Sequence, residues 1–148
     1  MENRSVESRI ADTLRRLESE ADVWIATASA AGVPHLIPLS LAWDGTNILL
    51  ATPPGSPTAR NIDATGQARA SLADTDDVVI VVASAASTPF EEMPDQVADE
   101  FAERAGWDPR RQEGRWALLT LTPDTIHAWK GEPELVGRTI MRRGEWAS

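Results

Sequence analysis

The dipeptide Asp44-Gly45 restricts the fold of this chain most, because it stands between two apolar runs. Residues 35–43 precede it and residues 48–51 follow it, and Asp-Gly at such a junction is a strong signal for a tight β-hairpin. Another β-forming run, 23–27, comes before a turn at residues 30–34. The sheet therefore begins with three strands in antiparallel meander order.

Helical spacing of apolar residues predicts three helices. The first is an amphipathic N-terminal helix over 5–20, and the second is a short helix over 57–64. The third is an inserted helix over 94–105, which begins at a proline, carries acids in its first turn and stops at Gly106. Residues 131–148 contain three glycines and a proline, and we expect an ordered but irregular tail there.

The remaining apolar runs predict strands over 67–73, 78–83, 116–122 and 125–129. Pro123-Asp124 separates the last two runs. The sum is six or seven antiparallel strands with inserted helices, in one domain over 1–148. A small antiparallel meander usually closes into a barrel, because closure removes exposed sheet edges.

Pro38 interrupts the second predicted strand. Proline has no N–H to donate to a sheet ladder. We therefore expect Pro38 at an edge, at a bulge, or where the backbone turns its polar groups toward something other than a neighbouring strand.

The segment 51–61, Ala-Thr-Pro-Pro-Gly-Ser-Pro-Thr-Ala-Arg-Asn, is a corner between a strand and a helix. The N–H groups and the dipole of a helix start favour an anion, and Arg60 can add a bidentate contact. Ser56 and Thr58 supply hydroxyl donors, so the corner can hold a phosphate. Alternatively, Ser56 or Thr58 only caps the helix, with Pro57 as its first residue.

Composition narrows the function. The net charge is -9 and the chain has no basic stripe, which argues against nucleic acid and anionic membranes as partners. There is no cysteine, so disulfides, thiolate catalysis and Cys-ligated metals are excluded. The first twenty residues lack an apolar signal region and no run is long enough to span a membrane. We expect a soluble, cytoplasmic protein.

His35 and His127 are the only imidazoles, and neither has a second ligand at metal spacing. A structural or surface role is the simpler interpretation for both. His127 is the better candidate for lining a cleft. No metal site is predicted.

Several short segments carry a family resemblance by their order and spacing: 22–27 (DVWIAT), Gly32-x-Pro34-His35-Leu36-x-Pro38-Leu39-Ser40, Trp43-Asp44-Gly45, 50–52 leading into 56–61 (SPTARN), 77–79, 106–110 and 137–146. Together they resemble the pyridoxamine 5′-phosphate oxidase-like, FMN-binding split β-barrels, in particular an actinobacterial group with deazaflavin-dependent members. The resemblance covers residues 17–146.

The resemblance implies a six-stranded antiparallel split barrel that forms a homodimer, with a flavin in each of two clefts at the subunit interface. By position it assigns the flavin ring to the backbone of Pro38, Leu39, Ser40 and Leu41, the ribityl chain to Ala51 and Thr52, and the phosphate to Ser56, Thr58, Arg60 and Asn61.

Four residues near the end of the chain have two interpretations each. Trp129 either stacks on the ring from the neighbouring subunit or anchors the dimer interface. Arg138, Arg142 and Arg143 either reach the cofactor or a substrate acid, or stay solvated.

Two departures from the family pattern matter. Pyridoxamine phosphate oxidases end in a strand carrying Arg and His and then an Arg-Leu-Ala-Pro tail, whereas this chain ends with residues 142–146 as Arg-Arg-Gly-Glu-Trp. We therefore do not predict that activity. Asp76 stands where relatives carry an arginine, which removes a cation from a phosphate or polyglutamate contact.

We predict an oxidoreductase that transfers hydride between a flavin-type cofactor and an unknown small organic substrate. FMN is the first choice, because the corner around Arg60 is sized for one phosphate. Two further alternatives are a reductase that uses the deazaflavin coenzyme F-420 and a non-catalytic protein that binds or stores a flavin or haem. A ligand-free dimeric scaffold is a fourth.

Overall fold

The structure, a computed structural model, describes residues 3–148. Its strands are β1 Asp22–Ala28, β2 Pro34–Ser40, β3 Ala42–Trp43, β4 Ile48–Thr52, β5 Gln67–Ser71, β6 Asp77–Pro89, β7 Ala117–Lys130, β8 Thr139–Arg142 and β9 Glu145–Trp146. These nine strands of the described chain form one sheet, and all their pairings are antiparallel. The main path runs β2-β1-β5-β6-β7-β4-β3, and β8 and β9 extend from β7.

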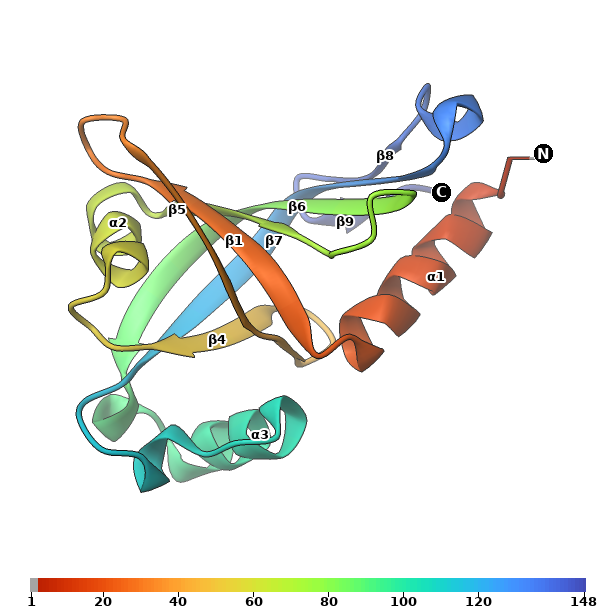
Figure 1. The fold of residues 1–148 in the computed structure, drawn as a ribbon. Coiled ribbons are helices and arrows are strands. Elements are labelled where there is room, and N and C mark those ends of the chain that lie inside the picture. The colour runs from red at the N-terminus through yellow and green to blue at the C-terminus, as the bar shows by residue number, and fades with distance from the viewer. Residues whose placement is uncertain (1–2) are drawn as a thin grey trace.

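The sheet curls into a split barrel, as predicted (Figure 1). Its two end strands, β2 and β3, are consecutive in the chain, with only Leu41 between them. The predicted hairpin at Asp44-Gly45 is confirmed, because Ala42 pairs with Leu49 and Gly45 has a positive φ of 98°. The single strand predicted over 35–43 is wrong, since the chain leaves one end of the sheet at Ser40 and rejoins the other end at Ala42.

The longest antiparallel pair of strands is β6 with β7. The prediction that Pro123-Asp124 separates two strands is wrong. These residues form a bulge inside β7, where the register shifts between the pairs Val82↔Thr125 and Ala83↔Pro123. A bulge tolerates proline because the ladder is already interrupted there. β6 is also longer than predicted, since it continues to Pro89 opposite Ala117.

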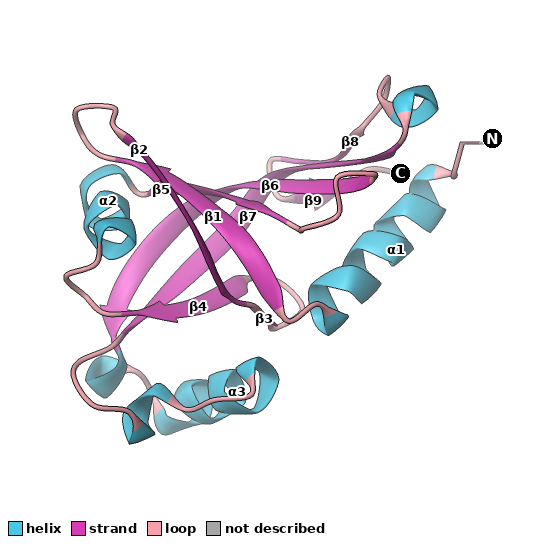
Figure 2. Ribbon diagram, viewed as in Figure 1, coloured by secondary structure: helices cyan, strands magenta, loops and turns pink. Residues whose placement is uncertain are grey.

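The helices lie around the barrel (Figure 2). They are α1 Val6–Ser19, α2 Pro57–Thr65 and α3 Asp95–Ala105, with short 3-10 turns η1 Phe90–Glu92, η2 Pro109–Arg111 and η3 Glu132–Glu134. Gly106 ends α3 in the left-handed conformation, as predicted. None of the helices within residues 3–148 combines the length and the apolar character that a membrane crossing requires.

Two hydrophobic clusters meet at β4, whose five residues are all buried. Ile48 and Leu50 face the barrel interior, and Leu49 and Ala51 face the cluster under α3. In that second cluster the Phe101 ring packs edge-on against Phe90, Trp107 lies 6.1 Å from Phe101 between centroids, and Trp116 lies 5.0 Å from Trp107. The insert between β6 and β7 therefore covers the outer side of β4 and fixes the strand that leads into α2.

The tail is more regular than predicted. Strands β8 and β9 form a hairpin in which Arg142 pairs with Glu145. The turn residues Arg143 and Gly144 have positive φ angles of 52° and 76°, as a type I′ turn requires. The prediction of an irregular tail over 131–148 is wrong because the glycines that suggested a loop include the turn of this hairpin.

A buried ion cluster joins the tail to the N-terminal segment. Glu134 is 2% exposed and its carboxylate accepts bonds from the backbone and guanidinium of Arg4, the closest at 2.7 Å, and from the Lys130 N–H at 2.8 Å. Arg9, 5% exposed, lies 3.7 Å from the same carboxylate. Arg4 also contacts Asp77 at the start of β6. This cluster connects segments 130 residues apart.

Acid should weaken this cluster. The bonds from Arg4 hold the pKa of Glu134 at about 2, below its ordinary value of 4.5. The unfolded chain takes up the proton first as pH falls, so the stabilisation is complete above pH 5 and is lost between about pH 5 and 2, amounting to about 3 kcal/mol. We expect urea-unfolding free energies to fall across that range, and to fall less steeply in Glu134→Gln. Parallel pH curves for the two proteins would contradict this.

Candidate functional site

The corner between β4 and α2 has the shape that the sequence predicts. Ser56 caps α2, because its Oγ accepts the Ala59 N–H at 3.1 Å, and Pro57 is the first helical residue. The Thr52 hydroxyl donates to Ser56 Oγ at 3.0 Å. The capping alternative is therefore confirmed for Ser56. Ser56 can still bind a ligand while it caps the helix, because its Oγ only accepts in these two bonds and its hydroxyl proton can be donated.

Thr58 is the unusual residue of the corner. It is completely buried, yet its Oγ1 finds no hydrogen-bond partner anywhere in residues 3–148. Leaving a buried hydroxyl unpaired costs on the order of 1–3 kcal/mol, so such groups are normally satisfied by protein, water or a ligand. Arg60, two residues on, is exposed and has no carboxylate within 4.0 Å among the described residues. One unpaired hydroxyl and one unpaired guanidinium thus stand at the start of α2.

Asn61 already has an internal role. It is buried, and its Nδ2 donates to Thr27 Oγ1 on β1 at 3.1 Å. This bond fixes α2 against the barrel, so Asn61 positions the corner. Its amide N–H groups are at most partly available to a ligand.

The predicted ring segment lies on the edge strand β2 and at the junction after it. Pro38 is exposed and pairs with Trp24 of β1, which confirms its expected place at an edge. Leu39 and Ser40 are half-buried at the end of β2. Leu41 is buried between the two end strands, and its N–H donates to the Ala21 carbonyl at 2.8 Å. The free backbone groups of this segment therefore lie before Leu41.

Ala51 and Thr52 lie at the end of β4 beside the corner, and both are buried. Trp129 lies far from them within one chain. Thr52 pairs with Ala117 at the start of β7, whereas Trp129 is twelve residues further along the same strand. At about 3.3 Å per residue that separation is roughly 40 Å. Trp129 could meet this site only from a second subunit, as the sequence analysis proposed.

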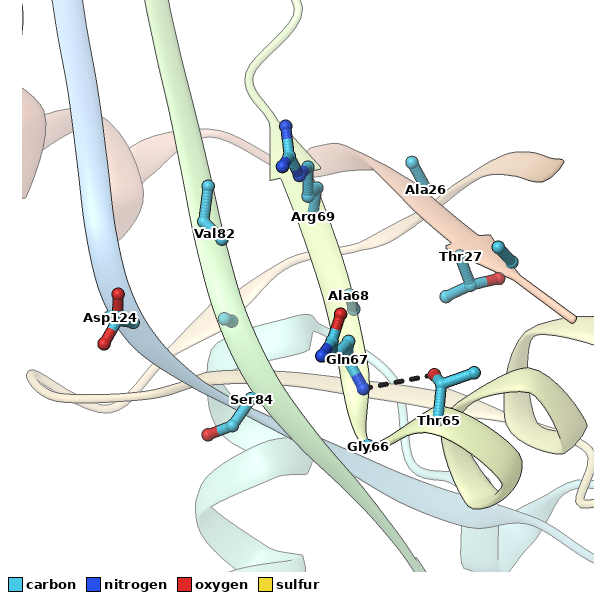
Figure 3. Close-up of a pocket in the computed structure, with 12 residues that line it drawn as sticks. Ala26, Thr27, Thr65, Gly66, Gln67, Ala68, Arg69, Val82, Ser84 and Asp124 are labelled. Atoms are coloured by element: carbon cyan, nitrogen blue, oxygen red, sulfur yellow. Dashed lines mark hydrogen bonds between the residues drawn. The ribbon is translucent and has the colours of Figure 1, made fainter. Parts of the chain in front are cut away.

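The structure contains a cavity that the sequence analysis missed. It has a volume of about 640 Å³ and lies over β1, β5 and β6 beside the end of α2 (Figure 3). Apart from Val82, the residues that line it are small or polar: Ala26, Thr27, Ala28, Thr65, Gly66, Gln67, Ala68, Arg69, Ala83, Ser84 and Asp124. Thr27 links this cavity to Asn61 of the corner. The small residues Ala26 and Ala28, which alternate along β1, are the part of the sequence that could have indicated this cavity. That interpretation requires knowing which strands lie beside β1.

The two histidines differ in their surroundings. His127 on β7 is half-buried and its Nδ1 lies 3.0 Å from the Thr139 hydroxyl. Partial burial, with the nearby Arg138, Arg142 and Arg69, lowers the pKa of His127. His35 is half-buried on β2. No group of three potential metal-ligating side chains occurs within the described chain.

Solved structures share this fold at low sequence identity. The heme storage protein HutZ of Vibrio cholerae is 17% identical with a TM-score of 0.68, and the match covers 81% of this chain and 94% of that one. An F-420 reductase is 19% identical over 76% and 93%, with a TM-score of 0.60. An FMN-binding protein of Nostoc punctiforme, related to pyridoxamine 5′-phosphate oxidase, is 18% identical over 84% and 84%, with a TM-score of 0.58.

These likenesses establish the fold alone. Sequence identities below 20% are too low to transfer a function from these proteins to this chain. No curated protein matches the chain. The family itself is established by sequence, since the model for pyridoxamine 5′-phosphate oxidase matches residues 11–130. The narrower actinobacterial group stays a prediction. This chain belongs to the pyridoxamine 5′-phosphate oxidase family.

Proposed function

We propose that this protein is an oxidoreductase that binds FMN and transfers hydride to or from a small organic substrate. The observation that carries the proposal is a pair of unused groups in the first turn of α2: the buried Thr58 hydroxyl, which has no partner in residues 3–148, and the exposed Arg60, which has no carboxylate within 4.0 Å there. A phosphate supplies the acceptor oxygens that both groups lack.

The residues of the corner fit one phosphate group. Arg60 would neutralise its charge, and the hydroxyls of Thr58 and Ser56 would donate to its oxygens. The exposed backbone at Pro38 and the following residues would border the flavin ring. When bound, FMN supplies the hydride chemistry itself, so the protein needs only to hold the ring and exclude competing reactions. The absence of a nucleophile at the corner is therefore no obstacle to this function.

A homodimer belongs to the same proposal. The outward face of β1 and β2 exposes Trp24 (42%) and Leu36 (59%), and the outward side of β6 carries the half-buried Val78 and Ile80. Tryptophan and large aliphatic residues are enriched where a partner covers a surface. A second subunit on this face would also bring its own Trp129 toward the site. We propose no nucleic acid or membrane as a partner.

Two other ligands are alternatives to FMN. The likeness to an F-420 reductase supports a deazaflavin coenzyme, and the likeness to HutZ supports haem without catalysis. For the ligand-stripped protein, titration with FMN, the deazaflavin coenzyme and haemin, followed by tryptophan quenching and visible absorbance, separates the three. Tight binding of FMN supports the first choice, whereas binding of only one of the others replaces the cofactor.

The corner makes a sharp prediction for two substitutions. Arg60→Ala should weaken FMN binding at least tenfold, about 1.4 kcal/mol. Thr58→Val should also weaken FMN binding without lowering the free energy of unfolding, because it removes an unpaired buried hydroxyl and keeps the side-chain volume. Titration and urea unfolding of both variants test this, with the exposed Arg111→Ala as control. Unchanged FMN affinity in both variants would reduce the corner to a helix cap.

A further inference from the structure

One hydrogen bond holds the middle of α2 against the wall of the barrel. The Asn61 side chain donates from Nδ2 to the Thr27 hydroxyl oxygen at 3.1 Å. Both side chains are almost completely buried, with Thr27 7% and Asn61 8% exposed. Within residues 3–148 no other hydrogen bond joins α2 to β1. Breaking a bond between two buried polar groups costs free energy, because the remaining partner cannot turn to water.

Thr27 stands at the point where β1 loses its neighbour β5. The ladder between these two strands ends at the pair Ala26↔Arg69, so Thr27 is the first residue of β1 beyond it. Buried side chains alternate along β1 at Val23, Ile25 and Thr27. At the third of these positions the strand presents a hydroxyl in place of an aliphatic group. This hydroxyl is the acceptor that α2 uses.

The ligand-binding groups of the corner belong to the same helix. Thr58 lies three residues before Asn61, so both lie on the buried face of α2, and Arg60 directly precedes Asn61. At the start of the helix Ser56 Oγ accepts the Ala59 N–H, and the Ser56 carbonyl accepts the Arg60 N–H at 3.0 Å. Because α2 is one continuous helix of nine residues, the position of Asn61 sets the positions of Thr58 and Arg60.

The C-terminal end of α2 has anchors of its own. Gly66 ends the helix in the left-handed conformation, and its carbonyl accepts the Ala85 N–H of β6 at 2.9 Å. The Thr65 hydroxyl oxygen accepts the N–H of Gln67, at the start of β5, at 3.3 Å. A change at Thr27 therefore leaves the helix attached to β5 and β6 and acts on its position against β1.

We propose that Thr27 is a positioning residue for the corner: its hydroxyl holds Asn61 and so places the first turn of α2 for one phosphate group. This inference rests on the proposed function, because it takes the corner as the phosphate site. It also assigns a role to Asn61. An amide that stays bonded to Thr27 positions the helix, whereas an amide that leaves Thr27 for the ligand is itself a phosphate contact.

FMN and riboflavin together isolate the phosphate, because the two molecules differ only in that group. The measured quantity is the ratio of their dissociation constants for the ligand-stripped protein, followed by tryptophan quenching. Thr27→Val removes the hydroxyl and nearly keeps the shape of the side chain. We expect it to reduce the preference for FMN by about tenfold, while riboflavin binds within about twofold of the parent. Thr27→Ser keeps the hydroxyl and should keep the preference.

Two features of the experiment guard against a folding defect. Partial unfolding weakens the binding of both ligands equally, so their ratio reports the position of the corner alone. Thr27→Ala leaves room for a water molecule beside the Asn61 amide, and it should show the same loss of preference in a second folded variant. Thr75→Val is the matched control, because Thr75 is exposed in the turn before β6. This control should keep the preference of the parent.

The outcomes separate this inference from the function on which it rests. If Asn61 contacts the phosphate directly, Thr27→Val frees its amide, and a preference for FMN that rises or stays the same overturns the positioning role. A preference that is lost in Arg60→Ala but kept in Thr27→Val leaves the corner as the phosphate site and removes only Thr27 from it. A parent protein that binds both ligands equally contradicts the proposed function, and the positioning role fails with it.

Discussion

Replacing Glu134 by alanine is expected to lower the free energy of unfolding by about 3–5 kcal/mol. The substitution leaves the nearly buried Arg9 and the partly buried Arg4 without the carboxylate that both face. It also removes the acceptor of the Lys130 N–H. Small domains are stable by only about 5–15 kcal/mol, so this loss is a large part of the free energy of unfolding. Urea unfolding at pH 7 measures it.

Two comparisons separate charge from packing at this position. Glu132→Ala lies in the same 3-10 turn but is exposed, and it should change stability by less than about 0.5 kcal/mol. The double variant Arg4→Ala, Glu134→Ala should lose less than the sum of the two single variants, because neither charge is then left alone. Strict additivity would show that Arg4 and Glu134 do not interact. A loss under about 1 kcal/mol for Glu134→Ala would show that the cluster is not a stabilising element.

Phe101→Ala is the second substitution with a large expected effect. Phe101 is fully buried on α3 and packs edge-on against Phe90, at 5.6 Å between centroids, and against Trp107. Truncating a buried phenylalanine typically costs about 3–5 kcal/mol, through lost burial and the cavity left behind. Urea unfolding followed by tryptophan fluorescence is a direct measurement, because Trp107 and Trp116 belong to the same cluster.

The neighbouring Glu100→Ala provides the matched control, since Glu100 is exposed on the same helix. It should leave the unfolding midpoint within error, given that surface substitutions usually act by less than about 0.5 kcal/mol. If Phe101→Ala and the parent have the same free energy of unfolding, the side chains under α3 must rearrange to fill the space of the missing ring. The cluster would then not be needed to hold β4 in place. A fluorescence change that precedes the loss of sheet signal would show that the insert unfolds separately from the barrel.

The corner and the hairpin could be predicted because their chemistry is local. Ser56, Pro57 and the Asp44-Gly45 turn act within a few residues, so sequence order contains nearly all the information. The prediction at Pro123 failed because it also relied on local chemistry. A proline usually ends a strand, but here β6 pairs with β7 on both sides of the bulge. Local rules therefore located the elements but not the ends of the longest pair.

The missed features all depend on distant pairs. The Arg4–Glu134 bonds span 130 residues, and nothing near either residue in sequence signals the other. The cavity depends on the registers of β1, β5 and β6, because one residue of slip would turn the side chain of Arg69 into the barrel. Only the arrangement in space shows which arginines remain unpaired.

The prolines of β2 limit how this barrel can associate with other chains. Leu41 donates toward β1 through Ala21, so by alternation the even-numbered residues of β2 direct their backbone N–H positions away from β1. Pro34 and Pro38 occupy two of these positions and have no N–H. Leu36 and Ser40 keep theirs, so half of the donors on this free edge are missing and it is a poor template for another strand. The seam between the two ends of the sheet can thus stay open to a ligand without inviting domain swapping or fibre growth.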